Sequence, residues 1–99
     1  MTDASPNLDQ MFQALADPTR RVMVERLSRS SASVSELAAP FAMSLPAIVQ
    51  HLQVLEQSGL VQTQKIGRTR TCTIDTGSLS LVEKWLNDRR VACLEKAPA

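Results

Sequence analysis

The chain has 99 residues, of which 43% are hydrophobic, and its formal net charge is +1. This length accommodates one small domain, and the apolar content excludes an intrinsically disordered chain. The net charge by itself neither indicates nor excludes a nucleic-acid partner.

The cysteine content and the hydropathy pattern exclude further classes. Cys72 and Cys93 are too far apart for a C-x-x-C metal site, and two cysteines do not make a disulfide framework. No apolar run approaches the ~18 residues of a membrane span, and no secretory signal pattern is present. We expect a cytoplasmic, reduced protein without membrane association, metal or cofactor. One histidine, no tyrosine and no glycine-rich phosphate loop argue against an enzyme.

Two short helices are predicted in the first third of the chain. Residues 1–7 are small and polar, and we predict a frayed tail there. Apolar residues at helical spacing then predict a first helix through Leu8, Met11, Phe12 and Leu15. Asp17 can cap a second helix that starts at Pro18 and runs to about Arg29.

A helix-turn-helix is predicted from the capping signals that follow. Residues 30–32 are expected to be a loop. Ser33 and Glu36 have the spacing of a capping box, which opens a short third helix that Pro40 ends. After a turn of a few residues, Ser44 begins the next helix. Two helices joined by so tight a turn are typical of this DNA-binding motif.

Residues 44–58 predict an amphipathic helix with marked ends. Ser44 is a suitable N-cap, proline is tolerated in the first turn, and Gly59 can adopt the left-handed conformation that ends a helix. One face carries an apolar stripe of Leu45, Ile48, Leu52 and Leu55. The other face carries Ala47, Val49, Gln50, His51 and Gln53. An ordinary solvated face would show Lys and Glu, so we interpret this segment as a recognition helix.

After Gly59 the pattern changes to that of a β-hairpin. Two runs rich in β-branched residues, within residues 61–74, flank a turn in which Gly67 supplies a positive φ. Lys65, Arg68 and Arg70 lie at its tip with no acidic residue among them. From Asp17 to Ile74, seven basic residues stand against four acidic ones, which is a modest basic footprint with one focus.

A final helix is predicted over about residues 78–95, with a second possible capping box from Ser80 to Glu83, and residues 96–99 are a predicted tail. Two apolar stripes on this helix require two partners, and we expect these to be the core of the domain and the same helix of a second subunit. The predicted fold is mainly α with a small β-hairpin, a winged helix-turn-helix that dimerises through its terminal helix. Its expected dimer interface comprises Leu8, Met11, Leu81, Trp85 and Ala92.

The order of these elements, with the stretches LADPTRRVMVERL, VSELA, SLPAIVQHLQVLEQSGLV and IGRTRT, resembles the ArsR/SmtB family of bacterial transcriptional regulators. The resemblance covers roughly Leu8 to Leu94. It implies a homodimer that binds a twofold-related DNA operator, with the recognition helix in the major groove and the wing on the backbone or minor groove. Such proteins usually repress transcription and release DNA when a ligand or oxidant arrives.

The resemblance also assigns expected DNA contacts. Gln50 falls on a groove-facing position where its amide can pair with adenine, while Ala47 and Val49 can touch a thymine methyl group. Arg20 matches an arginine of the family's DPTR stretch, although it can instead pair with an acidic neighbour. The expected DNA-binding set is Ser44, Leu45, Ala47, Val49, Gln50, His51, Gln53, Lys65, Arg68, Arg70 and Arg20.

Three departures from the family pattern matter. The cysteine pair of metal sensors is absent from VSELAAPF, and residues 75–95 contain no histidine for a zinc site. Gln53 stands where lysine is frequent, so the recognition helix has no fixed positive charge. This neutral helix leaves open an alternative, a winged-helix protein-interaction module without specific DNA binding. A lesser alternative is a thiol-responsive repressor that uses Cys93, whereas Cys72 reads as a buried, inert thiol. No effector is identified.

Overall fold

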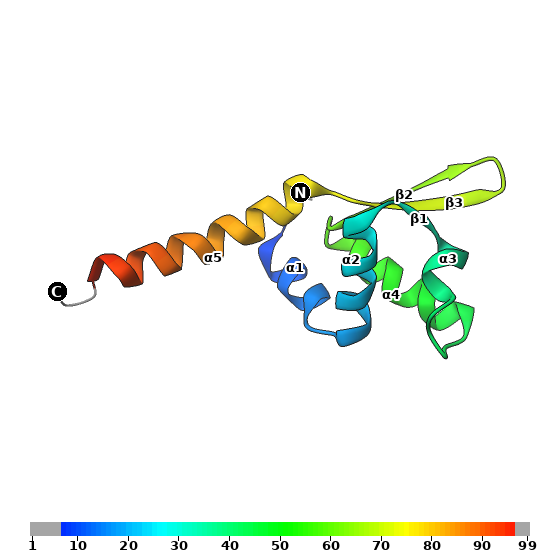
Figure 1. The fold of residues 1–99 in the computed structure, drawn as a ribbon, viewed down its shortest axis with the longest axis horizontal. Helices are drawn as coiled ribbons and strands as arrows, with labels where there is room; N and C mark the ends of the chain where they lie inside the picture. Colours follow the sequence, from blue (N-terminus) through cyan, green and yellow to red (C-terminus); the bar gives the residue numbers. More distant parts are fainter. Residues whose placement is uncertain (1–6, 97–99) are drawn as a thin grey trace, which may run out of the picture.

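The computed structural model describes residues 7–96 (Figure 1). The helices and strands follow one another in the order of a winged helix-turn-helix. The elements are α1 (Leu8–Leu15), α2 (Pro18–Arg29), β1 (Ala32–Ser33), α3 (Val34–Ala38), α4 (Leu45–Gln57), β2 (Val61–Ile66), β3 (Thr69–Ile74) and α5 (Thr76–Lys96). The predicted fold class is thus confirmed, with one additional strand.

Side-chain caps fix the start of each short helix. Asn7, placed in the predicted tail, instead caps α1 by accepting the backbone N–H of Gln10 at 3.2 Å. The rest of that tail, residues 1–6, lies outside the described residues, as do residues 97–99. The predicted capping box of α3 is complete, because Glu36 accepts the N–H of Ser33 at 2.9 Å and Ser33 accepts that of Glu36 at 3.1 Å. Both groups satisfy donors that would otherwise be left unpaired at the helix end.

The sheet has three strands in the order β1-β3-β2, all antiparallel. The prediction of a loop at residues 30–32 is wrong at its last residue, because Ala32 pairs with Cys72 and is buried. Two residues are too few to show the alternation that identifies a strand. This short strand ties the start of α3 to the wing, since Ser33 pairs with Thr71.

Helix α5 begins at Thr76, earlier than predicted. Asp75 accepts the N–H of Ser78 at 3.2 Å, and its second oxygen accepts the side-chain N–H of Gln62 at 2.8 Å. The predicted capping box at Ser80 is wrong, because that hydroxyl lies inside the helix and donates to the carbonyl of Thr76 at 3.0 Å. Asp75 therefore joins the wing to the terminal helix.

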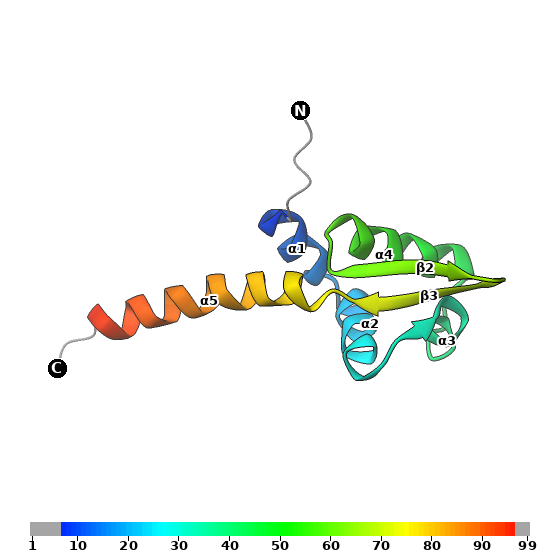
Figure 2. The same cartoon turned by 90° about the horizontal axis from the view of Figure 1, so that it is seen from above.

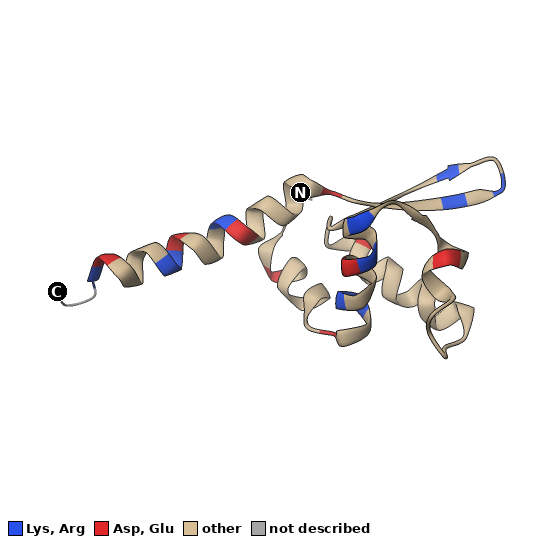
Figure 3. Cartoon of the chain, viewed as in Figure 1, with Lys and Arg blue, Asp and Glu red and all other residues tan. Residues whose placement is uncertain are grey.

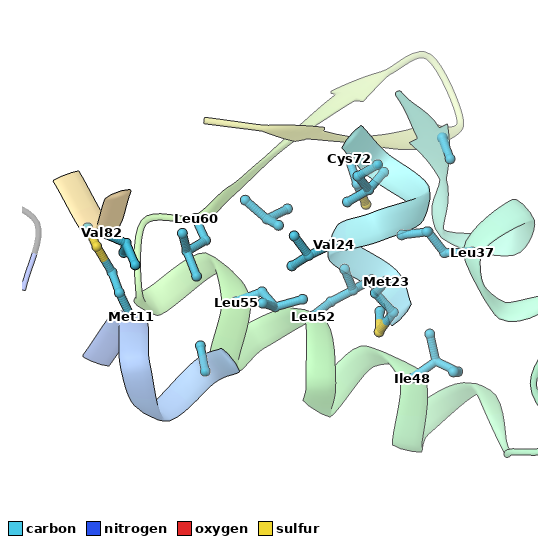
Figure 4. Close-up of a cluster of buried hydrophobic side chains, with 14 residues drawn as sticks. Met11, Met23, Val24, Leu37, Ile48, Leu52, Leu55, Leu60, Cys72 and Val82 are labelled. Carbon is cyan, nitrogen blue, oxygen red and sulfur yellow. The ribbon is translucent and has the colours of Figure 1, made fainter. Parts of the chain in front are cut away.

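One hydrophobic core lies between the helices and the sheet (Figure 4). Met11, Met23 and Leu55 are completely buried there, together with Leu60, which precedes β2, and Cys72 of the central strand β3. Only the first part of α5 reaches this core, through Val82. We expected Met11 at a dimer interface. Its side chain has no exposed surface in the protomer, so it cannot contact a second subunit directly.

The remainder of α5 extends away from the other elements (Figures 1 and 2). Large apolar side chains remain exposed along it, namely Leu81, Trp85, Leu86, Val91 and Leu94. Among residues 7–96, no helix is both long enough and apolar enough to cross a membrane. The exposed apolar side chains of α5 therefore lack cover within the protomer.

Candidate nucleic-acid interface

The recognition helix α4 is held by its buried side. The Ser44 hydroxyl accepts the N–H of Ala47 at 3.3 Å, and Pro46 occupies the first turn. Ile48, Leu52 and Leu55 are buried in the core (Figure 4). Three buried residues at helical spacing fix both the axis and the rotation of the helix, so its opposite face is presented in one orientation.

Leu45 departs from the predicted apolar stripe. It is 55% exposed, because it occupies the first helical position, one turn before Ile48, where the core ends. The other residues expected on the outer face divide into two groups. Val49, Gln50 and Gln53 are exposed, whereas Ala47 and His51 are half-buried. The surface presented by the first half of α4 is therefore apolar and amide-bearing.

Arg20, expected among the DNA contacts, has a structural role in this fold. Its guanidinium donates to the carbonyls of Ala14 at 2.7 Å and Gln13 at 3.1 Å, at the end of α1. These are carbonyls that the helix itself leaves unpaired. A third guanidinium nitrogen lies 3.4 Å from Nδ1 of His51. Arg20 thus connects α1, α2 and the recognition helix, and no signal local to the DPTR stretch reveals this.

His51 lies on the inner edge of α4 within the same network. Its Nδ1 is 3.4 Å from the Arg20 guanidinium and 3.8 Å from a carboxylate oxygen of Asp17. Asp17 also caps α2, and the N–H that Arg20 donates to it holds the pKa of the Asp17 carboxyl below its ordinary value. The Asp17 charge therefore faces both the start of α2 and the recognition helix.

The wing presents its cations around a tight turn. Ile66 pairs with Thr69, which leaves a two-residue turn of Gly67 and Arg68. Gly67 has φ +63° and no other residue type among 7–96 has a positive φ, so glycine at the first position suits a type II′ turn. Lys65 and Arg70 are directly opposite each other, and with Arg68 they place three basic residues around the end of the hairpin (Figure 3). The side chains of all three are exposed.

Arg70 lies on the face of the hairpin that looks toward α4. It is in register with Lys65 and two positions from the buried Cys72, so it shares the inner face of the strand. Its guanidinium donates to the hydroxyl of Thr63 at 2.9 Å. A small cavity between wing and helix, of about 290 Å³, is lined by Arg70, Val49 and Gln53 among others. The expected contacts of helix and wing are therefore brought together here.

The two cysteines differ in exposure. Cys72 is completely buried, and burial raises the pKa of its thiol, helped by the nearby charge of Glu56. A buried thiol of raised pKa is a poor nucleophile, which argues against a redox role for Cys72. Cys93 is exposed on α5. Within residues 7–96, no three His, Cys, Asp or Glu side chains gather closely enough to hold a metal ion.

The residues expected at a dimer interface fall into three groups. Leu81, Trp85 and Ala92 are exposed along α5, Leu8 is half-buried, and Met11 is in the core. Phe12 was not predicted at this surface, but it is exposed and packs edge-on against Trp85 with ring centroids 5.7 Å apart. The Arg89 guanidinium lies over the Trp85 ring, 5.0 Å from its centroid.

A helix-turn-helix that presents its second helix beside a basic two-stranded wing defines the winged-helix class of nucleic-acid-binding proteins. Comparison with known proteins agrees with this assignment to the winged-helix class. Residues 15–64 match the family described as "Helix-turn-helix domain". The HTH-type transcriptional regulator Rv2034 of Mycobacterium tuberculosis is 43% identical over 79 residues, which cover 80% of this chain and 74% of that protein.

Two further similarities identify which helix-turn-helix family the chain belongs to. The transcriptional repressor SdpR of Bacillus subtilis is 27% identical over 79 residues, covering 80% of this chain and 88% of that protein. A crystal structure of an ArsR family transcriptional regulator superposes with a TM-score of 0.83 at 48% identity, covering 92% of this chain and 93% of that one. The chain belongs to the ArsR/SmtB family of winged helix-turn-helix transcriptional regulators. It is therefore a DNA-binding regulator and not an enzyme, which confirms both predictions.

Proposed function

We propose that this protein is a homodimeric, sequence-specific repressor that binds an inverted-repeat operator. Helix α4 enters the major groove, and the wing lies on the flanking backbone or minor groove. The observation that carries the proposal is the placement of Arg70 on the inner face of the wing, beside Val49 and Gln53 of the recognition helix. One DNA segment lying along α4 would then also meet the wing.

The wing has the charge arrangement of a phosphate site. Lys65 and Arg70 are directly opposite each other in the hairpin, and like charges at such positions destabilise the strand pairing. The only compensating side-chain bond among the described residues is the one from Arg70 to Thr63. Phosphate oxygens between the two cations, with Arg68 at the turn, would relieve this repulsion.

The recognition helix divides the work with the wing. Within α4 the only charged side chain is that of Glu56, near the C-terminal end. The exposed Gln50 amide can donate an N–H to N7 of adenine while its carbonyl oxygen accepts an N–H from N6, and this bidentate pair provides discrimination rather than attraction. We infer that the wing provides most of the affinity for the backbone, and that α4 selects the sequence.

A second subunit supplies the twofold symmetry. Trp85 and Leu81 of α5 are exposed beside Phe12 of α1, and together they form an apolar surface that a twofold-related copy can cover. The name of the similar SdpR protein, a transcriptional repressor, supports repression as the regulatory outcome. Dimerisation would place two recognition helices on successive major grooves, about one helical turn apart.

A random-pool selection followed by salt titration tests the proposal. Purified protein should enrich an inverted repeat, and its affinity should fall steeply with salt because bound cations release counterions. Changing Arg68 and Arg70 to Ala should weaken binding to all sequences and lower the salt slope by roughly 2. Gln50→Ala should instead relax base preference, at a cost of roughly 1–3 kcal/mol against the selected site.

The control is Arg29→Ala, which removes an exposed arginine at the end of α2, beside the start of α5. This variant should bind the operator like the parent. If no sequence is enriched, specific DNA binding is refuted. Capture of a protein partner whose binding is unaffected by added DNA would then favour the alternative, an interaction module.

A further inference from the structure

The first half of α4 exposes aliphatic side chains that the fold does not use. Leu45 is 55% exposed and Val49 is 37% exposed. They are four positions apart, so their side chains are neighbours on one edge of the helix. The core requires neither of them, because Ile48, Leu52 and Leu55 already provide the buried face.

This edge also lacks the side chains that read guanine. The commonest specific contact to guanine is a bidentate Arg or Lys, and α4 contains neither. The two arginines near the helix are already engaged, since Arg20 donates to carbonyls of α1 and Arg70 donates to Thr63. The chemistry left on the exposed face is aliphatic, with the Gln50 amide next to it.

We propose that Leu45 and Val49 recognise the C5 methyl groups of thymine, and that each operator half-site has A·T pairs facing the first half of α4. This inference rests on the proposed function. Residues near the N-terminus of a recognition helix are those that reach base edges. The thymine methyl is the one apolar group that the major groove displays, and aliphatic side chains contact it. Gln50 pairs with an adenine of the same block.

Deoxyuridine tests this because it removes only the methyl group. The full chain is first used to select an operator from random DNA. Duplexes with dT changed to dU at single positions of the half-site are then measured by fluorescence anisotropy at fixed salt. At each thymine that Leu45 or Val49 contacts, dU should weaken binding about four-fold, the value expected for one buried methyl.

Variants assign the effect to the two side chains. Leu45→Ala and Val49→Ala should each bind the dT and dU duplexes equally at the position they contact, since the methyl has lost its partner. Both residues are exposed, so the fold does not depend on them. Val22→Ala is the matched control, because Val22 is 46% exposed on α2, outside the recognition helix. This variant should retain the dU penalty.

The outcomes separate this inference from the proposed function. Equal binding of dT and dU at every half-site position overturns the inference and leaves the repressor intact. A selected half-site built from G·C pairs would also overturn the inference alone. So would a dU penalty that persists in both Leu45→Ala and Val49→Ala. If no sequence is selected at all, the proposed function fails and the inference fails with it.

Discussion

The helical body and the outer part of α5 differ in how they hold their apolar residues. In the body, which comprises α1 to α4 and the sheet, the large side chains at helical spacing are buried in a single core. Along α5 beyond Val82, side chains of the same kind are exposed, and Leu94 is 63% exposed. Helix propensity cannot distinguish these regions, since both are well-formed helices.

The difference indicates which part of the molecule can bury its core within one chain. The body contains nearly all of the buried core, to which α5 adds Val82, and it caps its helices with Asn7, Asp17, Ser33 and Ser44. The outer part of α5 buries too little to be stable alone, because isolated helices of this length are marginal in water. Its stability in solution should therefore depend on the second subunit that we propose.

The largest expected effect compares one leucine from each region. Leu55→Ala should lower the free energy of unfolding by about 2–5 kcal/mol, because the residue is completely buried and its removal leaves a cavity. Leu94→Ala should change the stability of the protomer by about 0.5 kcal/mol or less. Urea denaturation at low protein concentration measures both. Similar losses for the two variants would contradict the distinction between the regions.

Trp85 tests the surface between the regions. Trp85→Ala removes an edge-on contact with Phe12 and an anchor of the proposed interface. Interface anchors of this kind are worth about 2 kcal/mol or more, so the dimer dissociation constant should rise at least about 30-fold. Sedimentation velocity over a concentration series checks this. Met43→Ala, at the same 40% exposure but in the helix-turn-helix, should leave dimerisation unchanged.

The sequence predicted the elements whose signals are local. The capping box of Ser33 and Glu36, the cap at Ser44 and the turn at Gly67 each depend on a few neighbouring residues, and all three are present in the structure. The site on α4 was predictable to the same extent, since the burial of Ile48 and Leu52 fixes which face is exposed.

Several errors fall where distant segments meet. Ala32 joins the sheet because Cys72 lies opposite it, and Met11 is buried in a core to which α5 also contributes Val82. The contacts of Arg20 depend on the approach of α1 to α2 and α4, which no spacing in the sequence encodes. Such contacts depend on the tertiary arrangement. Sequence periodicity does not contain that information, so it placed these residues at the surface.

Arg20 provides the next prediction, because it lies where α1, the helix that contacts α5, meets the recognition helix. Arg20→Ala breaks two hydrogen bonds from a charged group to carbonyls of α1, at a cost of about 1–3 kcal/mol of stability. Arg68→Ala, at the exposed wing turn, should leave stability unchanged and weaken only DNA binding. If the Arg20→Ala protein kept the stability of the parent but bound DNA more weakly, Arg20 would instead contact DNA directly.

The smallest expected effect concerns acid stability. The backbone N–H of Arg20 lowers the pKa of Asp17 from its ordinary 3.8, and a hydrogen bond from Lys84 likewise lowers the pKa of Asp88. A carboxyl whose pKa is lower in the folded state stabilises that state above the unfolded pKa, and this contribution disappears as the pH falls through the folded value. Both carboxylates should therefore stabilise the fold at neutral pH and cease to do so in acid.

The two carboxylates differ in the region they stabilise. Asp17→Asn keeps a side chain that can cap α2 but does not titrate, so the loss of body stability between about pH 5 and pH 3 should be shallower than in the parent. Asp88→Asn should alter that loss less, because its pair with Lys84 lies on α5, which can fray without unfolding the core. Urea midpoints across this pH range measure both variants. A greater flattening by Asp88→Asn would show that α5 unfolds together with the body, and the two regions would then be one cooperative unit.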